Sequence, residues 1–388
     1  MRSALALVLA LPLAAAAQDV PPGEPLEPVP ETMTAEEART SVRRAVDSLM
    51  VKQQKDGAYS SPVIESVLEA GFAIETYYAW QVSSQGLALR AMLVVEETPE
   101  RRASLERAAH WFLTTRMPKR GDHWDVDYMW SMVYALDALV ALSEDERFQD
   151  GDWPGLIEER GRAYMDLLDR NQSFMGGWGY YDDPPYTQRP KWGTVFSTAA
   201  VMPAIQKAIQ KGWYTDKAKA DRMLERSLDY VQRCALPNGA YAYDLSPIPR
   251  VGGESINDVK GSLGRIQVAN WARRELGDMR VTDEQIREGL AAFFREHAFL
   301  DAAFMRPIPH EAYYANAAYF YHFGHYYAAE VIELLPKEER AKWHAKLRPE
   351  LVKTQRQDGS LTDFLGTGYL RVASTAFTIL ALDAGADD

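Results

Sequence analysis

The chain has 388 residues, of which 47% are hydrophobic, and 55 acidic residues against 43 Lys and Arg give a formal charge of -12. This acidic balance argues against binding to nucleic acid or anionic membranes. The single cysteine, Cys234, excludes an intramolecular disulfide framework, so a large apolar core must stabilise the fold.

The first 17 residues have the features of a secretory signal. Arg2 supplies a positive charge, residues 4–13 are apolar but too few to span a bilayer, and Ala15-Ala16-Ala17 offers a cleavage site. We therefore predict a periplasmic or secreted mature protein. Residues 18–33 are predicted to form a Pro-rich tether, followed by one folded domain over 34–388. No integral membrane segment is expected in the mature chain.

A pattern recurs along the chain at intervals of roughly 60 residues. An amphipathic helix ends in Gln or Asn, a polar turn carries an aromatic, and a more apolar helix follows. The clearest copies begin at Gln54, Gln172, Cys234 and Gln355. A helix–turn–helix unit cannot bury its apolar face alone, so the copies must stack against one another.

The pattern predicts six α-hairpins, each with an outer helix followed by an inner one. Thr34 and Thr282 each open a capping box, and Pro336 suits the first turn of a helix. In chain order, we expect 34–53 with 83–95, 100–115 with 128–142, 156–170 with 194–210, 216–233 with 262–276, a helix opening at Thr282 with 312–334, and a helix after Pro336 with 373–384.

The two helices of a hairpin differ in polarity. The segment 103–113 is amphipathic, as expected of a half-exposed helix, whereas 372–382 is apolar or small nearly all round. Two concentric rings satisfy both patterns, with inner helices packed on both sides. The sequence therefore predicts an all-α fold of the α/α toroid type.

The turns resemble the Q-x-x-x-G-x-W signature of the squalene–hopene cyclase and protein prenyltransferase superfamily. The resemblance covers nearly the whole mature chain. It implies a toroid of the exported bacterial repeat-protein branch, with an isoprenoid, lipid or other elongated ligand in a central cavity.

The catalytic motifs of that superfamily are absent. The position that best matches the cyclase motif D-x-D-D reads Asp125-Val126-Asp127-Tyr128, which lacks the last acid. The residue two before Cys234 is Gln232, not the Asp of a prenyltransferase zinc site. Two alternatives therefore stay open: a carbohydrate-active hydrolase or lyase on an α/α toroid, and a non-catalytic scaffold with an envelope protein partner.

The turns from outer to inner helices should lie at one rim of the ring, and they are rich in acids and aromatics. A pocket opening at this rim is the expected binding site for a small or oligomeric ligand, unless the aromatics only wedge the hairpins together and the acids only cap helices. The catalytic candidates are His123, Asp125, Asp127, Asp182 and Asp183; the ligand-binding candidates are Trp124, Trp178, Tyr180, Tyr181, Tyr241, Tyr243, His310, Tyr314, Arg265 and Arg371.

No metal or cofactor is expected. His322 and His325 share a helix face and could bind zinc only with a third ligand from elsewhere; aromatic packing is the commoner outcome. A cavity walled by Tyr, Phe and Leu would favour the lipid reading. An acid pair about 5–9.5 Å apart above an aromatic groove would favour the carbohydrate reading. A ring plugged by its own side chains would favour the scaffold.

Overall fold

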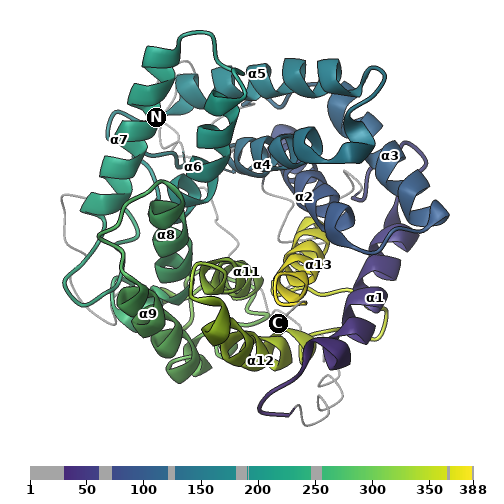
Figure 1. Ribbon diagram of the computed structural model, residues 1–388. Helices are drawn as coiled ribbons and strands as arrows, with labels where there is room; N and C mark the ends of the chain where they lie inside the picture. Colours follow the sequence, from purple (N-terminus) through teal and green to yellow (C-terminus); the bar gives the residue numbers. More distant parts are fainter. Residues whose placement is uncertain are drawn as a thin grey trace, which may run out of the picture.

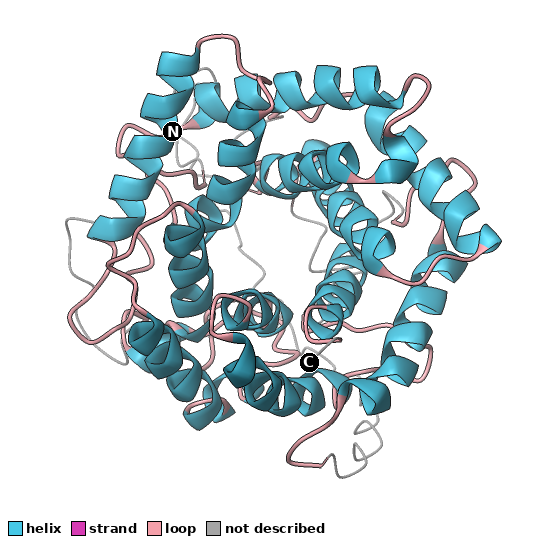
Figure 2. Cartoon of the chain, viewed as in Figure 1, coloured by secondary structure: helices cyan, strands magenta, loops and turns pink. Residues whose placement is uncertain are grey.

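The computed structural model describes residues 30–60, 72–120, 127–180, 190, 192–245, 256–364 and 368–386. Within these residues the chain forms helices joined by loops, with no strand and one isolated bridge between Ala235 and Tyr241 (Figure 2). None of the helices in these ranges is long and apolar enough to cross a membrane. The prediction of an all-α fold is confirmed.

The helices form two concentric rings (Figure 1). Successive inner helices contact one another, and the last returns to the first, which closes the ring. The inner ring consists of α2 (Ile74–Val94), α4 (Trp130–Glu144), α6 (Val195–Gln210), α8 (Leu263–Glu275), α11 (Phe320–Ile332) and α13 (Gly368–Asp383). The outer ring consists of α1 (Ala35–Lys52), α3 (Pro99–Thr114), α5 (Trp153–Asn171), α7 (Lys217–Arg233), α9 (Asp283–Arg295) and α12 (Lys337–Val352). A short helix, α10 (Ala298–Asp301), follows α9.

Polarity separates the two rings as expected. In α13, every residue from Val372 to Leu382 is buried, because this helix packs against neighbours in the inner ring and against α1 and α12. In the outer helix α7, the buried residues are Ala220, Met223, Ser227, Tyr230 and Val231, which recur at helical spacing. One apolar stripe therefore suffices for an outer helix, whereas an inner helix needs apolar or small residues all round.

A repeated side-chain clasp explains the recurring Gln and Gly. The Gln53 side-chain amide donates to the Gly57 carbonyl, at 3.2 Å, and to the Ser104 carbonyl of the next outer helix, at 2.8 Å. The third and sixth hairpins repeat this geometry, Gln172 with Gly176 and Met223, and Gln355 with Gly359 and Ser41. Since Ser41 belongs to α1, the last clasp joins the two ends of the ring. In the first copy, the clasping residue is Gln53 and not the adjacent Gln54.

Three inner helices begin well away from the predicted residue. α13 begins at Gly368, before the predicted residue 373. α2 begins at Ile74, well before residue 83. α11 begins only at Phe320, because Tyr314 and Ala315 have positive φ values of 57° and 53°, which a right-handed helix does not allow. The Asn316 side chain donates to the Lys260 carbonyl and fixes this segment. Both capping boxes, at Thr34 and Thr282, form as predicted.

Candidate functional site

The ring encloses a cavity of about 410 Å³ at the end where the inner helices begin. Five of the six inner helices contribute side chains, mostly from their N-terminal halves, and the connections before them supply the rest. The lining consists of Phe72, Trp80, Ser83, Ser84, Leu87, Asp127, Trp130, Tyr134, Tyr180, Phe196, Pro307, Ile308, Pro309, Tyr319, Phe320, Phe323, Phe364, Tyr369, Leu370, Ala373 and Phe377. The cavity therefore opens on the rim where the sequence predicted a site.

Aromatic rings from different inner helices contact one another inside the ring. Trp130 of α4 stacks on Phe196 of α6 with centroids 5.7 Å apart, and its ring edge meets Phe323 of α11 at 6.5 Å. Phe323 in turn meets Phe377 of α13 at 6.3 Å. These aromatic side chains form part of the cavity wall, and the cavity of about 410 Å³ shows that the ring is not plugged by its own side chains.

Asp127 is the carboxylate among the described residues that line the cavity. Its Oδ2 accepts a 3.0 Å hydrogen bond from the Trp80 indole N–H, and its backbone carbonyl accepts from the Trp130 amide at the start of α4. The acid thus sits beside a helix N-terminus, where the positive end of the helix dipole favours a negative charge. Asp127 is thus held from two neighbouring inner helices, by Trp80 of α2 and by the start of α4.

Three tyrosines form a buried polar network next to Asp127. Tyr243 hydrogen-bonds with Tyr180 and Tyr319 through their side chains. Burial raises the pKa of Tyr180 and of Tyr319 well above the usual range, and the nearby charge of Asp127 adds to both shifts. At neutral pH these phenols are therefore protonated and can donate hydrogen bonds to a ligand or to each other.

His310 extends this network. The Tyr319 hydroxyl lies 2.9 Å from His310 Nε2, and His310 Nδ1 lies 2.7 Å from the Ala315 carbonyl oxygen. A carbonyl can only accept, so in the neutral ring Nδ1 carries the proton and Nε2 accepts from Tyr319. His310 itself has a positive φ of 65°. A cavity-lining phenol is thus paired with an imidazole that could accept its proton.

The other sequence candidates occupy several places. Asp127 and Tyr180 line the cavity, and Tyr243 and His310 contact its wall. Trp178 is buried with its indole N–H bonded to the Leu168 carbonyl, and the Tyr241 hydroxyl bonds Asn270. The cavity lining does not include Trp178, Tyr241, Tyr314, Arg265 or Arg371. His123, Trp124, Asp125, Tyr181, Asp182 and Asp183 lie outside the described residues.

Arg265 supports the wall from behind. It is only 1% exposed, and its guanidinium donates to the carbonyls of Tyr241 and Ile256 while lying 5.5 Å from the Tyr243 ring centroid. This placement holds the loop before α8 in position. An anion in the cavity would reach Arg265 only by displacing the aromatic wall.

Sequence reasoning missed Trp80 and Trp130, which dominate the cavity wall. Both lie in the first two turns of inner helices, where an apolar residue resembles ordinary core. The one usable signal was a large aromatic near the start of successive inner helices. His322 and His325 face different partners: His322 contacts Asp363 and Thr354, whereas His325 contacts His297.

A second depression, of about 520 Å³, lies on the outer surface near Arg102, Arg147 and Trp153. Its cations are already paired, Arg102 with Glu106 at 2.6 Å and Arg147 with Asp145 at 2.7 Å. We therefore take the central cavity as the candidate site.

Comparison with known proteins adds information on the fold. No family model and no curated protein sequence matches the chain. An α-1,6-mannanase from Salegentibacter matches with a TM-score of 0.54 and 10% identity, over 91% of this chain and 98% of the mannanase. A possible GH105-family member from Klebsiella pneumoniae matches with a TM-score of 0.56 and 13% identity, over 91% and 94%. A polysaccharide lyase matches with a TM-score of 0.50 and 11% identity, over 89% and 96%.

These matches correct the resemblance inferred from the turns. These three structures, which share the fold over nearly the whole chain, are described as a mannanase, a possible member of the GH105 family and a polysaccharide lyase. The assignment to squalene–hopene cyclases and protein prenyltransferases is therefore wrong, and with it the isoprenoid or lipid ligand. The clasp gives the physical reason: the Gln and Gly of the turn join neighbouring hairpins and are not among the residues that line the cavity. The protein shares the α/α toroid fold with these carbohydrate-active enzymes.

Proposed function

We propose that the protein is a carbohydrate-active enzyme, a hydrolase or lyase, that binds an oligosaccharide in the central cavity. The observation that carries the proposal is Asp127, held by the Trp80 indole at the wall of an otherwise aromatic cavity. At these sequence identities the solved structures establish only the fold, and the class of substrate is inferred from the site together with that fold.

The cavity wall is rich in Tyr and Phe, the feature expected of a lipid-binding cavity, but its lining also suits a sugar chain. Trp80 and Tyr180 line the cavity with an apolar ring and one polar edge, which match the apolar face and hydroxyl rim of a pyranose ring. The volume, about 410 Å³, falls within the range of about 300–1,000 Å³ usual for ligand pockets. An open cavity of this size also disfavours a purely structural ring.

Asp127 is placed to transfer a proton to or from the scissile linkage. Glycoside hydrolysis by the usual routes needs a second carboxylate; the sequence offers Asp125, Asp182 and Asp183 for this role, and these acids remain predictions. Elimination needs one group that removes a proton and one that returns a proton to the leaving oxygen. Tyr319 with His310 beside Asp127 could supply those two roles without a second acid.

The signal predicted in residues 1–17 would deliver the enzyme to polysaccharides outside the cytoplasm. Residues 1–29 lie outside the described part of the chain, so export also remains a prediction.

The test is product formation from a panel containing α-1,6-mannan, uronic-acid polysaccharides and their unsaturated oligosaccharides. Mass spectrometry separates the two chemistries, because hydrolysis adds one water across the cleaved bond and elimination adds none but leaves a conjugated uronate that absorbs ultraviolet light. We expect at least one substrate to be cleaved. Absence of both cleavage and binding across the panel would contradict the proposal.

A further inference from the structure

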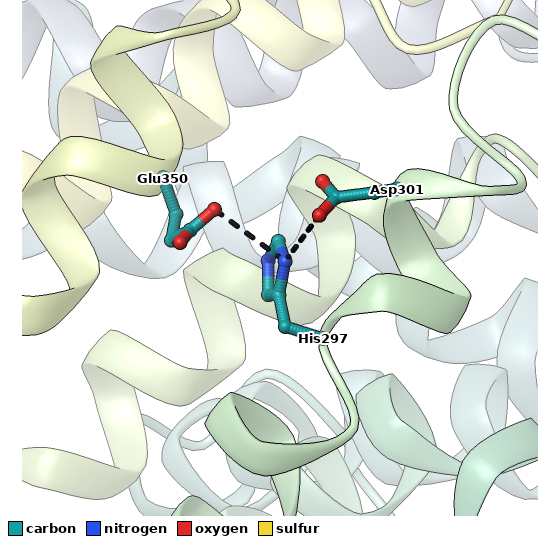
Figure 3. A group of neighbouring side chains, drawn as sticks. All are labelled: His297, Asp301 and Glu350. Atoms are coloured by element: carbon teal, nitrogen blue, oxygen red, sulfur yellow. Dashed lines mark hydrogen bonds and ion pairs between the residues drawn. The ribbon is translucent and has the colours of Figure 1, made fainter. Parts of the chain in front are cut away.

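A cluster outside the central cavity joins the fifth and sixth hairpins (Figure 3). His297 lies between α9 and α10, Asp301 ends α10, and Glu350 belongs to α12. His297 Nδ1 is 3.1 Å from Asp301 Oδ2 and 3.4 Å from Glu350 Oε2, and all three atoms lie within 4.8 Å of one another. Figure 3 shows both carboxylates directed at the same edge of the imidazole.

The neighbouring histidine fixes where the protons are. His325 Nδ1 lies 2.7 Å from the Tyr321 carbonyl oxygen, so this nitrogen carries a proton. His325 is fully buried, and in the neutral ring whose Nδ1 proton points at this carbonyl, Nε2 is the acceptor nitrogen. That Nε2 is 3.0 Å from His297 Nε2, which must therefore donate.

The other ring nitrogen of His297, Nδ1, faces the carboxylates of Asp301 and Glu350. If His297 is neutral, its Nδ1 holds a lone pair aimed at two carboxylate oxygens, which repel it. A metal ion held between the three atoms would give this lone pair and both carboxylates a common partner.

We propose that His297, Asp301 and Glu350 form a binding site for a divalent transition-metal ion of the zinc type. Zinc takes one His and carboxylates readily, with bonds of about 2.0–2.2 Å and a water completing a tetrahedron. Ligand atoms of such a tetrahedron lie about 3.3–3.5 Å apart, close to the 3.1 and 3.4 Å seen from His297 Nδ1.

The surroundings also match a metal site. Metal-binding histidines characteristically donate their other ring N–H to an acceptor that orients the ring, and here His325, itself oriented by Tyr321, is that acceptor. The Lys353 ammonium lies 2.9 Å from Asp301 Oδ1 and 2.5 Å from Glu350 Oε2. It neutralises the two acids in the absence of metal and must move aside when the ion binds, which its partial exposure allows.

The ion would tie the α9–α10 segment to α12. The connection after α10 carries Pro307, Ile308 and Pro309, which line the cavity. The site is thus a structural support for one cavity wall. It stands independently of the proposed carbohydrate chemistry.

The test is calorimetric titration of the chelator-treated full-length mature protein with Zn²⁺. We expect one ion per chain, a higher melting temperature with the ion bound, and at least about tenfold weaker binding for Asp301→Asn and Glu350→Gln. Asp301 is 43% exposed, so its substitution should not prevent folding. Mg²⁺ should not compete, because it prefers oxygen ligands only.

Lys353→Gln distinguishes the metal from a simple ion-pair network. Removing the competing ammonium should tighten Zn²⁺ binding, whereas in an ion-pair network it would only lower the melting temperature. His344→Gln is the matched control, because His344 is buried and bonds one carboxylate, Glu333, at 2.7 Å. No stoichiometric Zn²⁺ binding, or binding unchanged in Asp301→Asn, would overturn the proposal.

Discussion

The Trp80 indole of α2 donates a 3.0 Å hydrogen bond to the Asp127 carboxylate at the start of α4. The two residues belong to consecutive hairpins, and α2 and α4 are direct neighbours in the inner ring. One bond therefore couples the packing of the first two hairpins to the position of the candidate acid. A change in the packing of the first two hairpins would alter the site chemistry.

Trp80→Phe should lower turnover by about tenfold or more while leaving KM less affected. The substitution keeps an aromatic ring against Tyr77 and Tyr369 but removes the donor to Asp127. A hydrogen bond to a charged group is worth about 1.5–3 kcal/mol, which corresponds to roughly tenfold or more in rate. Steady-state kinetics on the cleaved substrate provides the measurement, and unchanged turnover would show that Trp80 does not position the acid.

Gly57→Ala should destabilise the fold far more than Gly239→Ala. Both glycines have positive φ, 104° and 83°, but a Cβ at Gly57 would lie 2.2 Å from the Arg107 carbonyl oxygen, whereas nothing lies within 4 Å at Gly239. Backbone strain alone costs about 1–2 kcal/mol, and overpacking adds about 1–3 kcal/mol. Denaturant unfolding should give a loss of about 2–5 kcal/mol for Gly57→Ala. Equal losses would refute the close packing of the clasp.

Glu330→Gln should stabilise the protein above neutral pH and have little effect in acid. Burial raises the pKa of Glu330 from its usual 4.5 to about 7. The charge of Arg90 opposes this shift, and the charge of Asp137 increases it. At a pH between about 4.5 and 7 the folded state holds a proton that the unfolded chain releases, so the free energy of unfolding falls as the pH rises through this range. Melting temperatures of wild type and variant should therefore diverge with rising pH.

The control for that experiment is Glu288→Gln, which changes an exposed acid of α9. Its melting temperature should follow that of the wild type at every pH. If Glu330→Gln also follows the wild type, Glu330 is already solvated in the folded protein.

The fold was predictable because its determinants are local and repeated. The amphipathic outer helices, the apolar inner helices and the boxes at Thr34 and Thr282 each follow from short-range pattern. The start of α11 could not be predicted, because His310, Tyr314 and Ala315 adopt left-handed conformations that only tertiary contacts can impose.

The site was predictable only in part. The rim and Asp127 followed from topology, since every outer-to-inner turn lies at the same end of the ring. Trp80 and Trp130 were missed because an inner helix is apolar on all sides, and its sequence does not show which residue faces the cavity. The turn motif was misleading for the opposite reason: it is conspicuous in the sequence but serves to join hairpins.

The most direct test of the central claim is turnover of the cleaved oligosaccharide by Asp127→Asn. The amide oxygen can still accept the Trp80 hydrogen bond, so the fold should persist, while proton transfer is lost at a cost of about 10²–10⁴ in kcat. Asp216→Asn is the control, since Asp216 caps α7 away from the cavity. We predict loss of turnover for Asp127→Asn alone, with melting temperatures within a few degrees of wild type. Full activity of Asp127→Asn would contradict the account.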